Sequence, residues 1–250
     1  MSSVPALKVR AIVLDIEGTT TPVDFVYKVL FPYARTHVPH YLEREWGNPA
    51  CADAVAILRR EQDAETDDTA HLESCATTEG VVAYVYWLMD RDRKSPGLKM
   101  LQGLVWRDGY ERGELNGVVY PDVPVAFERW QAAGIALYIY SSGSVLAQQL
   151  LFRSTASGDL TRVLSGYFDT AVGPKQSASS YTAILGRIQM PASEVLFVSD
   201  VAGELDAARA AGLQTALCVR ESAAPATVTH PVIRTFAEIN VVRVAQPADR

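Results

Sequence analysis

The feature that most constrains the fold is an alternation of helix-like and strand-like segments that begins near residue 119. Apolar residues recur every three or four positions in the helix-like segments, whereas the strand-like segments are short apolar runs. In chain order, the predicted segments are helix 123–133, strand 135–140, a helix ending at residue 152, helix 178–188, strand 195–199, helix 204–211 and strand 215–219. Such alternation predicts a parallel sheet with right-handed helical crossovers.

A further strand is predicted near the start of the chain, where the apolar run 12–14 stops at Asp15. A continuously apolar strand is typical of a sheet that is buried on both faces. Asp15 is therefore expected at the carboxyl end of this strand, where open α/β sheets bind ligands. Gly18 can adopt backbone angles closed to other residues, so Thr19 and Thr20 are expected to turn N–H groups and hydroxyls toward an anion. Taken alone, Asp15 is explained equally well as a solvated turn residue or a helix cap.

The long segment between these two regions shows helical periodicity and no convincing strand. We therefore predict a Rossmann-like α/β fold in which a parallel sheet flanked by helices is formed by residues 1–23 and 119–250, with residues 24–118 inserted as an all-helical cap domain. The acidic stretch 61–74 is interpreted as a surface connection, with an acidic helix as the alternative. The tail beyond residue 240 is expected to be weakly structured.

Composition limits the partners and the compartment. The net charge of −6 argues against a nucleic-acid or anionic-membrane surface, because such surfaces need clustered Lys and Arg. Cys51, Cys75 and Cys218 show no CxxC spacing and favour a reducing compartment over a disulfide framework. The N-terminus lacks a signal-peptide pattern, and the apolar runs are too short to span a bilayer. We expect a soluble, cytoplasmic monomer that binds neither nucleic acid nor membrane.

Polar side chains follow three of the predicted strands. Asp15 follows the first, Ser141 and Ser142 follow strand 135–140, and Asp200 follows strand 195–199. These strand ends meet at one edge of a parallel sheet, and Lys175 lies in a loop before a predicted helix. Two acids, a hydroxyl and a lysine are sufficient for phosphoryl transfer with a divalent metal.

These residues, in this order, resemble the haloacid dehalogenase superfamily of phosphohydrolases. Within it, four stretches are similar to the acireductone synthase, or enolase-phosphatase, family: Leu14-Asp15-Ile16-Glu17-Gly18-Thr19-Thr20-Thr21-Pro22, Leu30-Phe31-Pro32-Tyr33, Leu98-Lys99-Met100-Leu101-Gln102-Gly103 and Tyr138-Ile139-Tyr140-Ser141-Ser142-Gly143-Ser144. The resemblance covers essentially the whole chain. Glu17 is distinctive, because most phosphatases of the superfamily carry Asp at this position.

The resemblance implies roles for the acids. Asp15 would be the nucleophile that forms an aspartyl-phosphate. Asp15, Glu17 and Asp200 would hold Mg²⁺, a hard cation that prefers carboxylate and phosphate oxygens. Glu17 also stands where the superfamily has its general acid/base, so it is assigned to both the catalytic and the metal set. Whether it would bind the metal by its side chain or by its backbone stays open.

The other predicted site residues face the phosphate. Ser141 and Ser142 would donate hydrogen bonds to substrate oxygens, and the alternative for either is a strand-to-helix turn with an N-cap. Lys175 would neutralise the transferring phosphoryl group, and the alternative is an exposed lysine beside a proline. Glu204 and Asp206 either orient Lys175 or a metal-bound water, or simply stabilise a helix N-terminus.

The implied reaction converts 2,3-diketo-5-methylthiopentyl-1-phosphate to the acireductone and inorganic phosphate, by enolisation and then dephosphorylation, in methionine salvage. A generic small-metabolite phosphatase of the same superfamily is the nearest alternative. A phospho-acceptor signalling module is less favoured, because such modules take their acceptor from an internal strand and lack a large helical insert. A dinucleotide-binding dehydrogenase is disfavoured, because the first turn lacks G-x-G-x-x-G.

Overall fold

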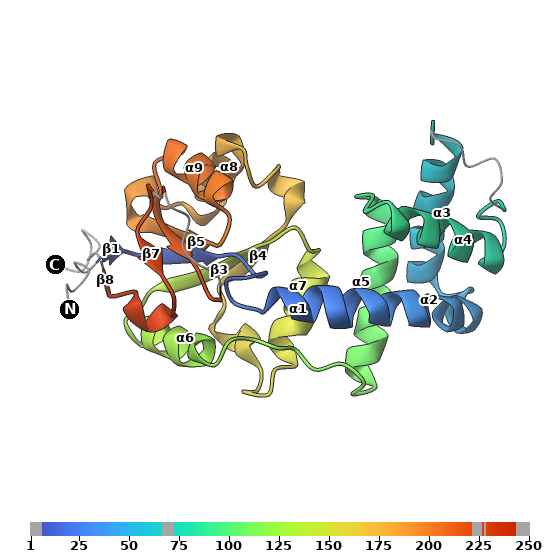
Figure 1. Cartoon of the computed structure of the whole chain (residues 1–250), viewed down its shortest axis with the longest axis horizontal. Coiled ribbons are helices and arrows are strands. Elements are labelled where there is room, and N and C mark those ends of the chain that lie inside the picture. Colours follow the sequence, from blue (N-terminus) through green and yellow to red (C-terminus); the bar gives the residue numbers. More distant parts are fainter. Residues whose placement is uncertain (1–6, 67–72, 222–226, 228, 244–250) are drawn as a thin grey trace. The chain divides into compact units, whose positions relative to one another are not determined.

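A computed structural model describes residues 7–66, 73–221, 227 and 229–243. The chain divides into two compact units, one formed by residues 1–23 and 117–250 and the other by residues 24–116. Strands occur in the first unit and helices in both (Figure 1). The first unit thus resumes at residue 117, two residues before the predicted position of 119.

The first unit is built on a parallel sheet. Its six strands lie in the order β4-β3-β2-β5-β6-β7, and all neighbouring pairs are parallel. The strands are β2 (Ala11–Leu14), β3 (Ala136–Tyr140), β4 (Gly166–Phe168), β5 (Val195–Ser199), β6 (Gln214–Cys218) and β7 (Val232–Ile233). Every residue of β2 and β5 is buried, as a strand in the middle of a covered sheet requires.

Helices cover both faces of this sheet. Figure 1 shows α8 (Ala178–Ile188) and α9 (Ala202–Ala210) on one face, with α6 (Asp122–Ala132) and α7 (Val145–Arg153) on the other. Under α8 and α9, the side chains of Tyr140, Tyr181 and Phe197 pack edge-on or tilted against one another, with ring centroids 5.1 to 6.4 Å apart. The sheet is therefore a rigid support for the loops at its carboxyl edge.

The second unit is helical and has its own core. The boundary between the units falls after the first residue of α1 (Val23–Phe25). The second unit then contains the π-helical turn Val26–Leu30, α2 (Phe31–Glu45), α3 (Pro49–Asp63), α4 (Thr78–Asp90) and α5 (Pro96–Glu111). The side chains of Asn48, Thr77 and Ser95 cap α3, α4 and α5 by accepting a backbone N–H bond from the first turn. Buried apolar residues of α2 to α5 form one cluster.

The structure corrects the expectation for the tail. Val241–Arg243 form strand β8, which pairs in parallel with β1 (Leu7–Val9), whereas residues 244–250 lie outside the described residues. The acidic stretch is helical up to Asp63, and residues 67–72 within it are not described. β4, β7 and the β1–β8 pair were not predicted.

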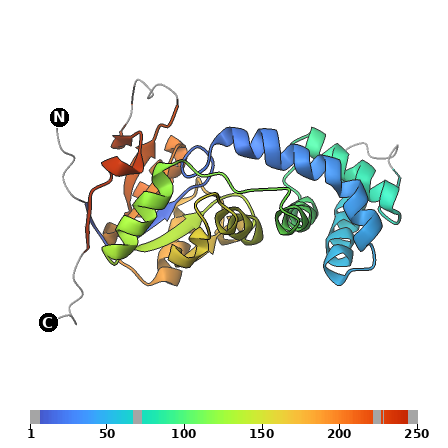
Figure 2. The ribbon, with the colours of Figure 1, turned by 90° about the horizontal axis from the view of Figure 1, so that it is seen from below.

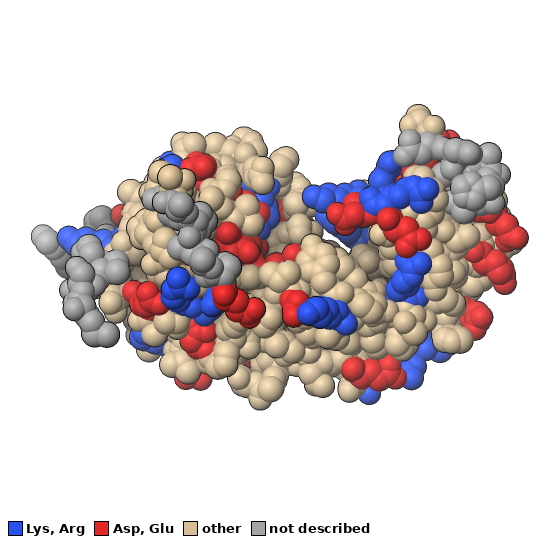
Figure 3. Space-filling view, viewed as in Figure 1, with Lys and Arg blue, Asp and Glu red and all other residues tan. Residues whose placement is uncertain are grey.

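Charges are mixed on the surface. On the face drawn in Figure 3, Lys and Arg are interspersed with Asp and Glu. No helix among the described residues combines the length and the apolar character needed to cross a bilayer.

Candidate active site

Register places the predicted site residues at neighbouring strand ends. Leu14 pairs with Ile139 of β3 on one side and with Val198 of β5 on the other. Asp15 therefore emerges between Ser141 and Ser199, which end or follow these two strands. The sequence alone placed Asp15 and Ser141 at this edge, and the structure brings them together there.

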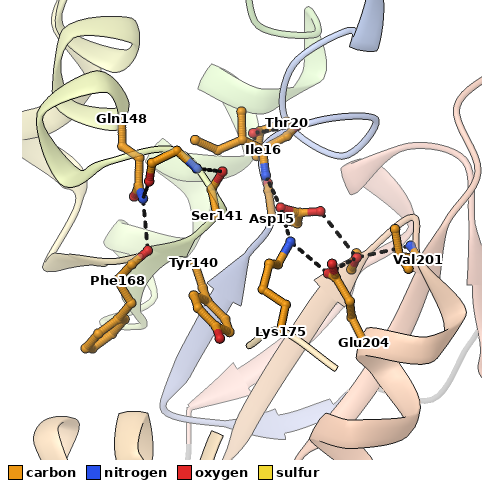
Figure 4. Close-up of polar contacts among 12 residues, drawn as sticks. Asp15, Ile16, Thr20, Tyr140, Ser141, Gln148, Phe168, Lys175, Val201 and Glu204 are labelled. Atoms are coloured by element: carbon orange, nitrogen blue, oxygen red, sulfur yellow. Dashed lines mark hydrogen bonds and ion pairs between the residues drawn. The ribbon is translucent and has the colours of Figure 1, made fainter. Parts of the chain in front are cut away.

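Asp15 lies at the centre of a buried polar network. Only 4% of the residue is exposed. Its Oδ1 atom lies 2.6 Å from Nζ of Lys175 and accepts a 2.7 Å hydrogen bond from the N–H of Ile16. Its Oδ2 atom lies 3.3 Å from Oγ of Ser199. Figure 4 shows the side chains of Asp15, Lys175 and Glu204 pointing toward one another.

Lys175 forms a second ion pair in this network. Its Nζ lies 2.7 Å from Oε2 of Glu204, and that oxygen also accepts a 2.9 Å hydrogen bond from Ser199. Burial alone would lower the pKa of Lys175, but the charges of Asp15 and Glu204 outweigh it and raise the pKa. Burial, followed by repulsion from Asp15, raises the pKa of Glu204. Lys175 is thus a cation shared by two carboxylates, with only 10% of its side chain exposed, and not an exposed lysine.

The backbone of the Lys175 loop is held by three hydroxyls. Tyr140 donates to the carbonyl of Gly173 at 3.0 Å, and Ser180 donates to that of Pro174 at 2.8 Å. Tyr181 donates to the carbonyl of Lys175 itself at 2.7 Å. All three donor residues are buried. Because consecutive carbonyls are fixed from within the core, the direction in which the Lys175 side chain leaves the backbone is fixed too.

Glu17 and Asp200 add negative charge around Asp15. Burial, followed by repulsion from Asp15, raises the pKa of Glu17 to about 7. Partial loss of solvent around its carboxylate and repulsion from Asp15 raise the pKa of Asp200 to about 6, although the residue as a whole stays exposed. The Asp200 carboxylate covers the backbone of Gly18, where an added Cβ would lie 2.3 Å from Oδ2. Gly18 is required here for space as well as for its φ of +67°.

These acids suit a divalent cation. The charge of Asp15 raises the pKa of both Glu17 and Asp200, so a bound positive charge would relieve the repulsion. Carboxylate oxygens are also the donors that hard cations prefer. Within the described part of the chain, however, no group of three or more His, Cys, Asp or Glu side chains is drawn together closely enough to hold a metal ion.

The turn after Asp15 differs from the expectation. The N–H groups of Thr19, Thr20 and Thr21 do not face outward toward an anion, because all three donate to the carbonyl of Ile16 at 2.9 to 3.2 Å. The Thr20 hydroxyl lies within hydrogen-bond distance of the carbonyls of Asp15 and Ile16, at 3.0 and 3.3 Å. The expectation that the N–H groups of Thr19 and Thr20 bind an anion is therefore wrong, because the carbonyl of Ile16 already accepts them.

The Ser141–Ser142 turn is held from beneath by Gln148 of α7. The Gln148 amide donates to the carbonyls of Gly143 at 2.8 Å and Phe168 at 2.9 Å, as Figure 4 shows. Ser141 is buried, and its hydroxyl accepts a 3.2 Å bond from the N–H of Gly143, whereas Ser142 is exposed. The cap of α7 is Ser144, so neither predicted serine is used as the N-cap.

Several residues of the site were not predicted: Ser199, the donors Tyr140, Ser180 and Tyr181, and Gln148. Ser199 could have been suspected, because it directly precedes Asp200 at a strand end. Tyr140 and Tyr181 fit the apolar pattern of a strand and a helix, and nothing in that pattern reports where a hydroxyl points. Asp206 lies away from the network and pairs with Arg209 at 2.6 Å.

Known proteins share this sequence and architecture. Residues 9–212 match the model of the haloacid dehalogenase-like hydrolase family. The chain is 50% identical to an enolase-phosphatase E1 of Synechococcus elongatus over 216 residues. The aligned region covers 86% of this chain and 90% of that protein. The chain is 45% identical over 235 residues to an enolase-phosphatase E1 of Pseudomonas aeruginosa, covering 94% and 100%. The crystal structure of the Saccharomyces cerevisiae UTR4 protein is similar with a TM-score of 0.75 and 34% identity, covering 92% of this chain and 99% of that one.

Proposed function

The chain belongs to the haloacid dehalogenase-like hydrolases, and from this premise and its likeness to the enolase-phosphatases we propose the following reaction. The protein enolises 2,3-diketo-5-methylthiopentyl-1-phosphate and then removes its phosphate, which yields the acireductone and inorganic phosphate. The observation that carries the proposal is the 2.6 Å contact between Lys175 and Asp15, because it places a cation beside the carboxylate that would attack phosphorus.

In the dephosphorylation step, Asp15 is the nucleophile. One of its oxygens bonds to phosphorus, the bond from phosphorus to the substrate oxygen breaks, and that oxygen takes up a proton. Water then cleaves the aspartyl-phosphate and regenerates the carboxylate. Lys175 balances charge on the phosphoryl oxygens, and Ser141 and Ser142 orient them by hydrogen bonds.

Glu17 is our candidate for the enolisation base, which takes the carbon-bound proton. A general base works best when its pKa lies near the working pH. In the metal-free protein, burial and repulsion from Asp15 raise the pKa of Glu17 to about 7, which satisfies this condition. An ordinary exposed glutamate, with a pKa of about 4.3, would be a weaker base.

Proteins of this family use a divalent metal, and we propose Mg²⁺ held by Asp15, Glu17 and Asp200. When bound, the cation would polarise substrate oxygens and offset their negative charge. The repulsion among these acids supports the assignment. We also expect the helical unit, residues 24–116, to act as a cap that excludes water during turnover, and the protein to act as a cytoplasmic monomer.

The decisive experiment measures two products in parallel. Purified protein with Mg²⁺ is given the diketone phosphate, a sugar phosphate and a nucleotide monophosphate; released phosphate and the ultraviolet absorbance of the enediol are followed. We expect both signals to appear with the diketone phosphate and the other rates to be much lower. Comparable phosphate release from all three substrates would instead identify a generic phosphatase. A phosphoprotein that persists after brief exposure to acetyl phosphate would identify a signalling module.

A further inference from the structure

Arg220 reaches the turn that follows Asp15 from a strand end at the same carboxyl edge of the sheet. It lies just beyond β6, and its side chain is only 6% exposed. Its Nε and Nη2 atoms both donate to the carbonyl of Thr19, at 3.0 and 2.7 Å. We propose that Arg220 is a positioning residue for phosphate release, which holds the turn 15–21 in its active geometry through the Thr19 carbonyl. The inference rests on the function proposed above.

The guanidinium group is itself fixed on every side. Its Nη1 atom donates to both carboxylate oxygens of Asp122, at 2.9 and 2.8 Å. The rings of Tyr120 and Phe236 lie 4.4 and 4.6 Å from its central carbon, at cation–π distance. Asp122 is anchored in turn by the N–H of Phe236 at 2.6 Å. A planar group held by an ion pair and two rings can define the position of an acceptor more rigidly than a lysine could.

Peptide geometry carries this constraint across the turn. In a trans peptide, the carbonyl of one residue and the N–H of the next point in opposite directions. With the Thr19 carbonyl directed at Arg220, the N–H of Thr20 is directed at the carbonyl of Ile16, 2.9 Å away. The next peptide repeats the arrangement: the N–H of Tyr120 binds the Thr20 carbonyl at 3.0 Å, and the N–H of Thr21 reaches Ile16 at 2.9 Å.

Ile16 connects this arrangement to the nucleophile. Its carbonyl collects the amides of the turn, and its own N–H donates to Oδ1 of Asp15 at 2.7 Å. Loss of the bonds from Arg220 would free the Thr19 peptide to rotate. This rotation would weaken the hydrogen bonds that the Ile16 carbonyl accepts from the turn. The Asp15 carboxylate would then lose its orientation toward phosphorus, although every group in the chemical step would still be present.

Arg129 of α6 provides a control. Its Nη2 atom donates to the carbonyls of Phe236 and Ile239, at 2.8 and 3.1 Å, although the residue as a whole is exposed. It makes no hydrogen bond to the turn 15–21 in the described structure. Arg129→Met should therefore remove an arginine that binds main-chain carbonyls without disturbing the turn.

The test compares Arg220→Lys, Arg220→Met and Arg129→Met, well below the melting temperature of each. Amide hydrogen exchange is measured for peptides covering residues 15–22, and kcat and KM are measured for phosphate release. We expect both Arg220 variants to exchange faster in these peptides and to lose about 10- to 100-fold in kcat, with KM within about threefold of the unmodified protein. Arg220→Lys retains the charge, so it remains informative where Arg220→Met fails to fold.

Two results would overturn the proposal: exchange in peptides 15–22 that is unchanged in Arg220→Lys, or a kcat for Arg220→Lys that equals that of Arg129→Met. Failure of the proposed function would look different. The unmodified protein would then release no phosphate, whereas the exchange comparison would still decide whether Arg220 holds the turn.

Discussion

The Nζ atom of Lys175 lies 2.6 Å from the Oδ1 atom of Asp15, inside the protein and at the carboxyl edge of the sheet. The two residues come from distant parts of the chain, one from the end of β2 and the other from the loop before α8. Their contact joins the proposed nucleophile to the cation that would balance phosphoryl charge.

Replacing the nucleophile should abolish turnover. We expect Asp15→Asn to reduce phosphate release by a factor on the order of 10⁴ or more, because an amide cannot form the aspartyl-phosphate. The measurement is release of inorganic phosphate with Mg²⁺ present. Asp53→Asn, at an exposed position on α3, is the control and should retain full activity. Turnover of Asp15→Asn close to that of the unmodified protein would refute the assignment.

Removal of the Tyr181 hydroxyl, which binds the Lys175 carbonyl, should lower the activity. Tyr181→Phe removes the 2.7 Å bond to the Lys175 carbonyl, and we expect the rate to fall about fivefold, the equivalent of roughly 1 kcal/mol for one hydrogen bond. Tyr167→Phe is the matched control, because the buried Tyr167 hydroxyl has no hydrogen-bond partner among the described residues. Steady-state rates and thermal melting of both variants provide the comparison. An equal effect of the two substitutions would argue against a role for the Lys175 loop.

Gly18 should not tolerate a side chain. In Gly18→Ala the new Cβ would lie 2.3 Å from Oδ2 of Asp200, so Asp200 must move, and we expect activity to fall by at least about tenfold. Gly113→Ala separates this effect from backbone strain: Gly113 has a similar φ of +72°, but an added Cβ would meet nothing within 4 Å. We expect Gly113→Ala to lower the free energy of unfolding by about 1 kcal/mol and to leave the activity unchanged. Equal activity of the two variants would contradict the explanation.

Cation binding should depend on pH near neutrality. Without metal, burial and repulsion from Asp15 raise the pKa of Glu17 to about 7 and that of Asp200 to about 6. Protons therefore compete with the cation below these values, so Mg²⁺ affinity should fall as pH drops from 8 to about 5.5, with protons released on binding. Calorimetry in buffers of different ionisation enthalpy measures that release. Glu17→Gln should flatten the dependence near pH 7, and a dependence identical to that of the unmodified protein would exclude Glu17 as its source.

The Asp122–Arg220 pair should make stability sensitive to acid. Burial alone would raise the pKa of Asp122, but hydrogen bonds from Arg220 and Phe236 outweigh it and lower the pKa. The stabilisation is therefore complete above the ordinary Asp pKa of about 3.9 and is lost as pH falls through the lower, folded value. In urea unfolding, Asp122→Asn should cost about 3 kcal/mol at pH 7, and this difference should shrink toward pH 3. A cost that does not vary with pH would contradict the ion-pair explanation.

Much of the fold could be predicted because burial leaves a pattern in the sequence. β2 and β5 are buried along their whole length, and they appear as apolar runs that are unbroken up to Ser199 at the end of β5. The strands that were missed have two or three residues, too few for any period to show: β4, β7, β1 and β8. β1 and β8 also pair with each other from opposite ends of the chain, so neither carries a local signal of its partner.

By itself, the sequence determined that Asp15, Ser141 and Asp200 meet at one edge of the fold, because the carboxyl ends of parallel strands meet whatever lies between them. Only the tertiary structure decided how that edge works. Lys175 pairs with Asp15 and Glu204, its carbonyl accepts a bond from the Tyr181 hydroxyl, and Arg220 binds the Thr19 carbonyl. All of these are ion pairs and hydrogen bonds made by polar side chains. Such bonds depend on distance and direction to a fraction of an ångström, and apolar periodicity encodes which face of an element is buried but not where a polar atom points.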